Sequence, residues 1–403
     1  MQQPEALQPK PAANVLEVPP DFSLVVGGPL YQLYLRTGLA RPPLQLVLRR
    51  MLVIPAICWA PLWFLAAIGG HLTAGVTDPF LRDPEVHIRF LVALPLLIAS
   101  EVYVHQRMRT IVAQFPARGI IARQDQPRFE QFVASAMRLR NSAAIELALF
   151  ILVVTLGHWI WRQKVTLNVS SWYALKTAAG LHLTAAGSYY ALVSLSIFRF
   201  ILVRWYFRLY IWYRFLWQVR ALPLHLNLFH PDRAGGLGFL AGSLPALAPV
   251  FIAQTALLAG FIYSRILYAG EQLPAFKLEI AGAFLFYVLV IVFPLGFFAL
   301  HLEEAERKAK REFGTLASHY VDDFRQKWVR GGAPAGEPLL GTADIQSLAD
   351  LANSYDVVRE IHLLPITTQS FLRLVTALAL PLLPLTLTVF PLDELIKGLL
   401  RLF

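Results

Sequence analysis

The sequence is poor in the residues that build disulfide-linked or highly charged soluble domains. It contains one cysteine, Cys58, so no intramolecular disulfide can form. Charged residues make up only 15% of its 403 positions, whereas an ordinary soluble domain carries about 25%. These shortages exclude a disulfide-rich secreted domain and argue against one large soluble domain.

The common signatures of enzymes are also missing. The sequence has no phosphate-binding P-loop, no G-x-S-x-G nucleophile elbow, no dinucleotide-binding fingerprint and no H-E-x-x-H zinc motif. We therefore expect no cofactor, with a bound metal ion as the lesser alternative, and we favour a function other than catalysis.

Hydrophobic residues, in contrast, make up 56% of the chain and gather in long runs. A run of about 20 residues that is nearly free of charge is long enough to cross a bilayer as a helix. The pattern predicts an all-α, polytopic membrane protein of about seven spans. The predicted spans are Met51–Gly70, Ile88–His105, Ala144–Trp161, Leu181–Val203, Leu247–Leu267, Ile280–Leu302 and Phe371–Pro391.

Basic residues predict the orientation of these spans. If the N-terminus is inside, the inner segments hold 25 of the 36 lysines and arginines and the outer segments hold 9. This bias indicates an N-in, C-out topology. Because the basic residues adjoin apolar spans, the net charge of +10 favours anionic lipid headgroups over nucleic acid as a partner. The predicted spans with their basic loops, together with the excess of arginine over lysine, lead us to expect a multi-pass protein of a bacterial inner membrane.

The domain organisation follows from these spans and from changes in composition. Segments 106–142 and 303–369 are too long for simple connectors, and each is expected to form cytoplasmic helices, the second including a helix capped by Asp344. The predicted divisions are a disordered cytoplasmic tail (1–20), an interfacial amphipathic segment (21–50), a first membrane half (51–220), a Pro/Gly elbow (221–243) and a second membrane half (244–403).

The fourth span continues into a belt of aromatic residues and arginines. Residues 181–220 contain no proline, so they predict one helix of about 40 residues and about 60 Å. The hydrocarbon core needs only about 30 Å. We expect the helix to project inward, with its aromatic rings packed on the charged extension of the sixth span and on a helix around Phe129–Leu139.

Four ionisable residues fall at the inner ends of predicted spans, and such residues are default functional candidates. They form a predicted charged layer of Glu101, Glu146, Arg199 and Arg373. One interpretation is a set of ion pairs that locks the helices together, with Glu146 paired to Arg199 or Arg373. The other is a gate or an ion-coordinating layer.

A second set of residues has the chemistry of metal or anion ligands. It comprises His105, His225, His230, Asp232, Arg233, His301 and Glu304. Its spacing matches no complete metal signature. Around Asp232, the glycines at 235, 236 and 238 favour a sharp structural turn, and an anion held by their amides and Arg233 is the alternative.

Small and hydroxyl residues are concentrated on the fourth span and face a few polar residues of the fifth. A hydrated path would be lined by His182, Ser188, Tyr189, Ser194, Gln254 and Thr255. Small and polar residues in membrane helices serve more often in helix packing, so both interpretations stay open.

These features favour a channel or transporter-like protein with a basic cytoplasmic vestibule, and self-association is compatible with them. A membrane-embedded enzyme acting at the cytoplasmic interface is one alternative, and a scaffold or sensor that docks a cytosolic partner is the other. No residue in the sequence specifies a substrate.

Overall fold

The computed structural model describes residues 22–164, 170–177, 180–338 and 342–388. The predicted disordered tail (1–20) lies outside the described residues. Within the described ranges, seven helical segments are long and apolar enough to cross a membrane. The predictions of a mostly helical fold and of seven candidate spans are therefore confirmed.

Several spans consist of consecutive helical pieces. The bounds are α2 (Val47–Ile68), α3 (Pro84–His87) with α4 (Leu94–Ala117), α6 (Ala143–Lys164), α7 (Ala185–Tyr189) with α8 (Leu195–Val219), α9 (Ser243–Ala269), α10 (Lys277–Val292) with α11 (Ala299–Phe324), and α13 (Thr368–Ala379). Outside them lie α1 (Pro29–Arg36), α5 (Gln126–Arg140), α12 (Ala343–Arg359), β1 (Ala174–Thr177) and β2 (Gly180–Leu183).

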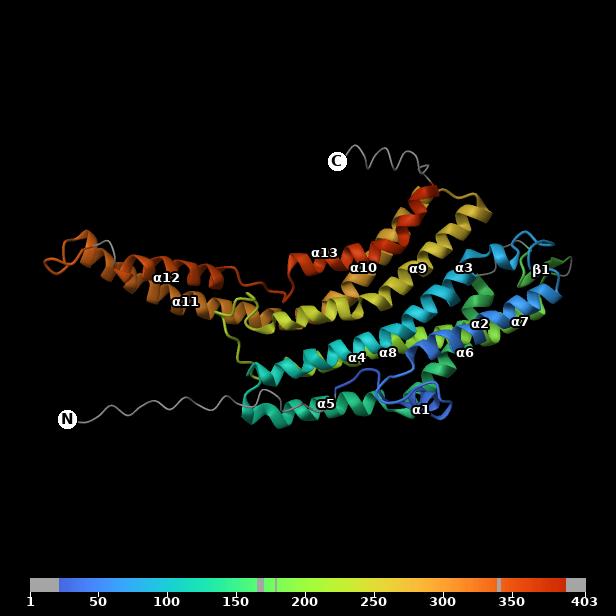
Figure 1. The fold of residues 1–403 in the computed structure, drawn as a ribbon, viewed down its shortest axis with the longest axis horizontal. Coiled ribbons are helices and arrows are strands. Elements are labelled where there is room, and N and C mark those ends of the chain that lie inside the picture. The colour runs from blue at the N-terminus through green and yellow to red at the C-terminus, as the bar shows by residue number, and fades with distance from the viewer. Residues whose placement is uncertain (1–21, 165–169, 178–179, 339–341, 389–403) are drawn as a thin grey trace.

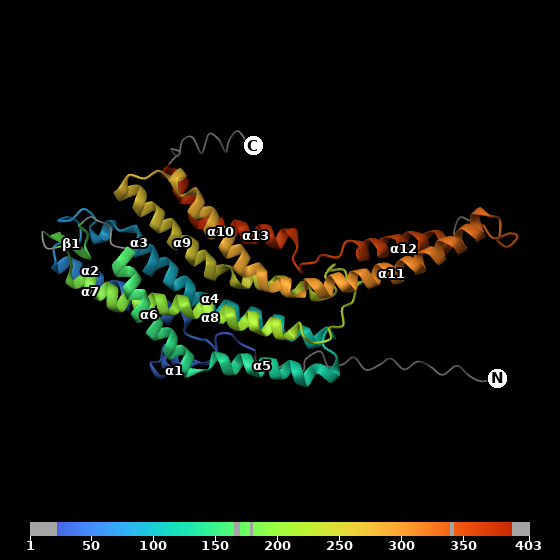
Figure 2. The same cartoon turned by 180° about the vertical axis from the view of Figure 1, so that it is seen from behind.

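The helices α4, α8 and α9 form the centre of the bundle. Helix α4 packs against α2 and α9, and α8 packs against α5 and α6. Figures 1 and 2 show α6 crossing obliquely on one side of this centre, with α10 and α13 beside α9 on the other. The hydrophobic core follows the same helices and is continuous from α2 to α9.

Three spans change their helical winding next to a proline, and in the seventh span the change is the 3₁₀ stretch Leu380–Thr388 around Pro384. A π-helical stretch, Ile88–Ala93, precedes Pro95, and a 3₁₀ stretch, Phe293–Phe298, contains Pro294. Proline lacks an amide hydrogen and its ring displaces the carbonyl four residues earlier. The altered winding absorbs this defect without ending the span.

The fourth span is one unbroken helical segment from Ala185 to Val219, as predicted. Its projection into the cytosol stays a prediction. Phe215 packs on Phe129 of α5 with ring centroids 5.8 Å apart, as expected. Trp217 packs on Phe297, at 5.1 Å, which lies within the sixth span and not on its charged extension. The predicted start of the fourth span at Leu181 is wrong, because Gly180–Leu183 pairs with Ala174–Thr177 as an antiparallel hairpin. The helix begins at Ala185, after the N-cap Thr184.

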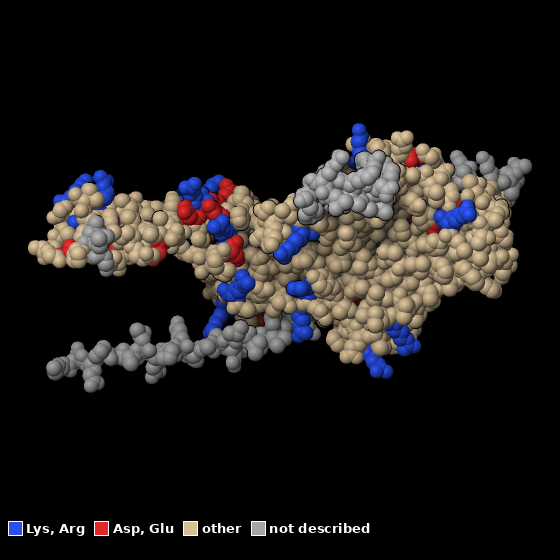
Figure 3. Space-filling model, turned by 45° about the horizontal axis from the view of Figure 1, so that its top comes forward, with Lys and Arg blue, Asp and Glu red and all other residues tan. Residues whose placement is uncertain are grey.

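Beyond the bundle, α11 and α12 lie side by side as a long helical hairpin (Figures 1 and 2). Charged side chains gather on this hairpin and at its base, whereas most of the visible face of the bundle is uncharged (Figure 3). The predicted cap of α12 is wrong by two residues, since Thr342 is the N-cap. Asp344 instead accepts hydrogen bonds from Lys327 and Trp328, which join α12 to the π-helical turn Arg325–Val329 that follows α11.

Candidate functional site

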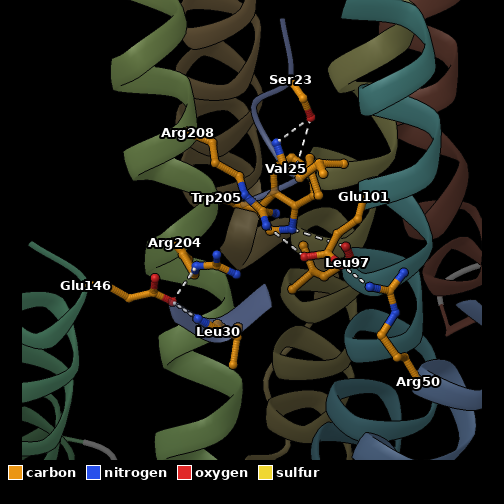
Figure 4. Close-up of polar contacts among 11 residues, drawn as sticks. Ser23, Val25, Leu30, Arg50, Leu97, Glu101, Glu146, Arg204, Trp205 and Arg208 are labelled. Carbon is orange, nitrogen blue, oxygen red and sulfur yellow. Dashed lines mark hydrogen bonds and ion pairs between the residues drawn. The ribbon is translucent and has the colours of Figure 1, made fainter. Parts of the chain in front are cut away.

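The helix α8 carries two buried arginines one turn apart, Arg204 and Arg208, which are 6% and 4% exposed. Residues four apart lie on the same side of a helix. Arg208 Nη2 donates a hydrogen bond of 2.8 Å to Glu101 Oε1 on α4. Arg204 Nε lies 3.0 Å from Glu146 Oε1 on α6. Figure 4 shows the two arginines pointing toward these carboxylates from the same helix.

A third arginine, Arg50 of α2, approaches the same site from the opposite side (Figure 4). It is fully buried, and its Nη1 lies 3.3 Å from Glu101 Oε2. None of its three guanidinium nitrogens has a hydrogen-bond partner among the described residues. The Tyr34 ring lies 5.5 Å from this guanidinium, close enough for a cation–π contact.

We call Arg50, Glu101, Glu146, Arg204 and Arg208 the buried charge cluster. Its three guanidinium groups face two carboxylates, so the ionised cluster carries one unbalanced positive charge. Removing each ion from water costs several kcal/mol, and pairing offsets this cost only where the geometry is good. The guanidinium of Arg50 is therefore the most costly group in the cluster.

The segment before the first span closes the cluster on one side. Phe22 packs its ring on Phe215, with centroids 4.9 Å apart, and Leu30 N donates to Glu146 Oε1 at 3.1 Å. Gly28 makes this approach possible. Its φ is +84°, and an added Cβ would lie 3.1 Å from the Glu146 carboxylate. The N-terminal segment is thus part of the site.

A small cavity lies beside the Glu146–Arg204 pair. Its volume is about 10 Å³, and its polar lining is Arg140, Glu146, Arg204 and Arg208. A cavity needs roughly 10–15 Å³ to hold one water molecule. This cavity therefore has room for about one water molecule.

Only half of the predicted charged layer belongs to the cluster. Glu101 and Glu146 do, but Arg199 donates to the carbonyl of Gly157 at 2.7 Å, and Arg373 is exposed on α13. The pairing predicted for Glu146 is corrected, because its partner is Arg204. The spacing of Arg204 and Arg208 along one helix was the signal in the sequence that would have identified them.

The predicted metal or anion ligands are scattered. His105 bonds Ser23 at 2.8 Å, His225 and Glu304 are exposed, and His301 lies in the first turn of α11. Within the described part of the chain, no three His, Cys, Asp or Glu residues lie close enough together to hold a metal ion. The remaining candidates, His230, Asp232 and Arg233, lie together in the elbow.

Two of the three glycine amides that the alternative anion site would have used, those of Gly236 and Gly238, already have a partner. The carboxylate of Asp232 accepts hydrogen bonds from the amides of Ala234, Gly236 and Gly238 at 2.8–3.1 Å. An added Cβ on Gly238 would lie 2.8 Å from Asp232. The elbow is therefore a loop organised by its own aspartate.

The residues proposed for a polar path mostly connect helices. Ser194 donates to the carbonyl of Cys58 at 2.8 Å, and Tyr189 donates to that of Ile57 at 3.0 Å, so both bind α2. On α9, Gln254 accepts a hydrogen bond from Tyr206 of α8. Thr255 donates to its own helix at Ile252 and Ser188 is exposed. His182 lies on β2 rather than in a span.

At the end of the bundle that carries the strands, two buried aspartates lie near each other. Asp83 caps α3 by accepting from the amides of Glu85 and Val86, and it accepts from Trp172 Nε1 at 2.9 Å. Asp78 is 1% exposed, and its Oδ1 has no hydrogen-bond partner among the described residues. Burial, reinforced by the charge of Asp83, raises the pKa of Asp78 to about 8. Asp78 therefore holds a proton at neutral pH.

This raised pKa makes stability depend on pH. The native state binds a proton that the unfolded chain releases above its ordinary pKa of about 4, so stability should fall as the pH rises from about 4 to about 8. The slope has an upper limit of about 1.4 kcal/mol per pH unit. Melting temperatures between pH 5 and pH 9 test this, because Asp78→Asn should flatten the profile. Identical profiles for the two proteins would show that Asp78 does not titrate in this range.

Comparison with known proteins finds no matching family model, no matching curated protein and no matching solved structure.

Proposed function

We propose that the protein is a channel or transporter for small anions and that the buried charge cluster is its gate. The unbalanced guanidinium of Arg50, fully buried and without a hydrogen-bond partner among the described residues, is the observation that supports this proposal. Ionisable residues at membrane depth are costly and are retained where they serve a function. An anion that enters the cluster would supply the missing negative charge.

The packing around the cluster supports a closed state of this gate. The cavity beside Glu146 has room for about one water molecule, and the segment from Phe22 to Leu30 covers it. In an open state, this segment would withdraw from Glu146 and expose Arg204 and Arg208. The passing anion would then replace protein groups as the partner of the arginines.

We propose that the protein lies in a bacterial inner membrane with its N-terminus in the cytosol. The distribution of basic residues between inner and outer loops supports this orientation. In this arrangement the basic inner loops would meet anionic headgroups, and association with a second copy stays a prediction.

A cysteine at the exposed Thr73, with Cys58 replaced by serine, should react with an impermeant maleimide in intact spheroplasts. A cysteine at the exposed Ser318 on α11 should react only after lysis. The opposite pattern would reverse the orientation.

Reconstitution of the purified protein in liposomes tests the activity. Chloride, nitrate, phosphate and small carboxylates should be compared with potassium at equal concentration. We expect flux of at least one anion above that of empty liposomes and no flux of potassium. Absence of all anion flux, or a preference for potassium, would contradict the proposal.

The helical hairpin of α11 and α12 supports a second function, that of a scaffold or sensor. It projects beyond the bundle and exposes apolar side chains, including Leu316 (54%) and Val329 (70%). A partner that binds there should be lost on Leu316→Arg while anion flux persists. Loss of both together would argue against a separate docking function.

A further inference from the structure

A second pocket, unrelated to the buried charge cluster, lies at the elbow. Its volume is about 610 Å³, which is in the range of pockets for small organic ligands. Three segments line it: the end of α4 at Arg118, the elbow loop from His230 to Phe239, and the connector between α12 and α13 from His362 to Thr367. It shares no residue with the cluster.

The wall that the elbow contributes is preformed. Because three backbone amides bind the carboxylate of Asp232, the loop is fixed and the negative charge of this residue is already stabilised. Arg118 completes this wall by donating to the carbonyl of Gly236 at 3.2 Å. Its guanidinium lies 5.1 Å from the centroid of the Phe239 ring and 4.0 Å from Asp232 Oδ2.

The second cation of the pocket is held in an unfavourable backbone conformation. Arg233 has a φ of +52°, in the left-handed region that favours glycine. Its guanidinium pairs with Glu360, the residue that follows α12, and both side chains are about half exposed. Glycine adopts this positive φ with less strain than arginine. Arginine at this position therefore contributes through its side chain and not through its backbone.

The other lining residues define the rest of the ligand. Two imidazoles, His230 and His362, add hydrogen-bonding groups, and Pro365, Ile366 and Phe239 add an apolar surface. The volume is too large for an inorganic ion alone. Arginines recognise phosphate through paired hydrogen bonds, and the apolar surface suits a body attached to that phosphate.

We propose that the elbow pocket binds a phosphate group carried on a small apolar body, with Arg118 and Arg233 as its cationic partners. The phosphate displaces Glu360 from Arg233. Since Glu360 directly follows α12, binding loosens one contact between the helical hairpin and the membrane bundle. Phe239, in the 3₁₀ turn before α9, and Thr367, the N-cap of α13, both line the pocket, so it lies next to two candidate membrane spans. The phosphate belongs either to a lipid headgroup or to a soluble phosphorylated compound.

Three variants separate binding from folding. Arg233→Gly removes the guanidinium and relieves the positive φ, so its melting temperature should equal or exceed that of the parent while phosphate binding is lost. Glu360→Gln removes the competing carboxylate and should tighten binding by roughly threefold. Arg359→Gln, an exposed position that does not line the pocket, should bind as the parent does.

The measurement is the shift in melting temperature of the full chain in a phosphate-free maltoside detergent at fixed ionic strength. The soluble probe is glycerol 3-phosphate, with glycerol as its control. The lipid probe is dioctanoyl phosphatidylglycerol, with dioctanoylglycerol, which has the same chains without phosphate, as its control.

A stabilising shift with either phosphate probe, lost in Arg233→Gly and enhanced in Glu360→Gln, supports the proposal, and the probe that acts identifies the source of the phosphate. No shift with either probe would overturn it. So would an equal shift in the parent and in Arg233→Gly.

Discussion

Replacing Glu101 by glutamine should lower the free energy of unfolding by roughly 3–5 kcal/mol, the usual cost of removing one partner from a buried ion pair. Glu101 is 5% exposed and is the one carboxylate among the described residues that forms ion pairs with both Arg50 and Arg208. Glutamine keeps the size of the side chain but leaves two buried cations without a counter-charge. Reversible unfolding in mixed detergent micelles measures the loss.

A matched control and a double variant identify the cause. Glu312→Gln, at a 68% exposed position on α11, should change stability by less than about 0.5 kcal/mol. Adding Arg208→Gln to Glu101→Gln should recover part of the loss, because one cation is then removed as well. Strictly additive losses would mean that the two side chains do not interact.

Replacing Gly187 by alanine should cost about 3 kcal/mol or more, at the upper end of what overpacking causes. The added Cβ would lie 1.9 Å from the carbonyl oxygen of Tyr173. That oxygen also accepts the amide of Thr184, which caps α7. Relief of the clash must therefore displace the strand region from the fourth span and disturb the cap.

Gly282 of α10 is the matched control, since it is also a glycine in a membrane helix and an added Cβ would meet no atom within 4 Å. Gly282→Ala should leave stability within about 1 kcal/mol of the parent or raise it slightly. Thermal unfolding of the two variants side by side is sufficient. Equal effects would show that the close approach of Tyr173 to Gly187 is not tight.

The spans and the long fourth helix were predictable because their signals are local. A run of apolar residues identifies a membrane helix without knowledge of its neighbours, and the absence of proline between 181 and 220 predicted an uninterrupted helix. The strands Ala174–Thr177 and Gly180–Leu183 were missed because they are four residues each. The apolar residues of β2 also merge with the span that follows.

The cluster was only half predictable because its partners are set by tertiary structure. Glu101 and Glu146 stand out as acids within apolar sequence, but Arg50 belongs to an Arg-Arg pair that flanks a span, and such pairs usually indicate orientation. Arg204 and Arg208 lie in the belt of aromatic residues and arginines, where the sequence alone assigns them no partner. Only the packing of α2, α4, α6 and α8 brings the three arginines to the two carboxylates.

Arg50 also has a property that separates function from stability. Arg50→Gln leaves two arginines paired with two glutamates, so stability should stay within about 1 kcal/mol of the parent or rise. The neighbouring Arg49 is exposed and contacts only the carbonyl of Gly38 among the hydrogen bonds of the described residues. Arg49→Gln is therefore a control with the same chemistry one position away.

Anion flux into liposomes that contain the parent, Arg50→Gln or Arg49→Gln, at equal protein density, tests the role of the unbalanced guanidinium most directly. We predict that the parent and Arg49→Gln carry the anion at the same rate and that Arg50→Gln, although folded, loses most of this flux. Flux in Arg50→Gln equal to that of the parent would contradict a gate built on the buried charge cluster.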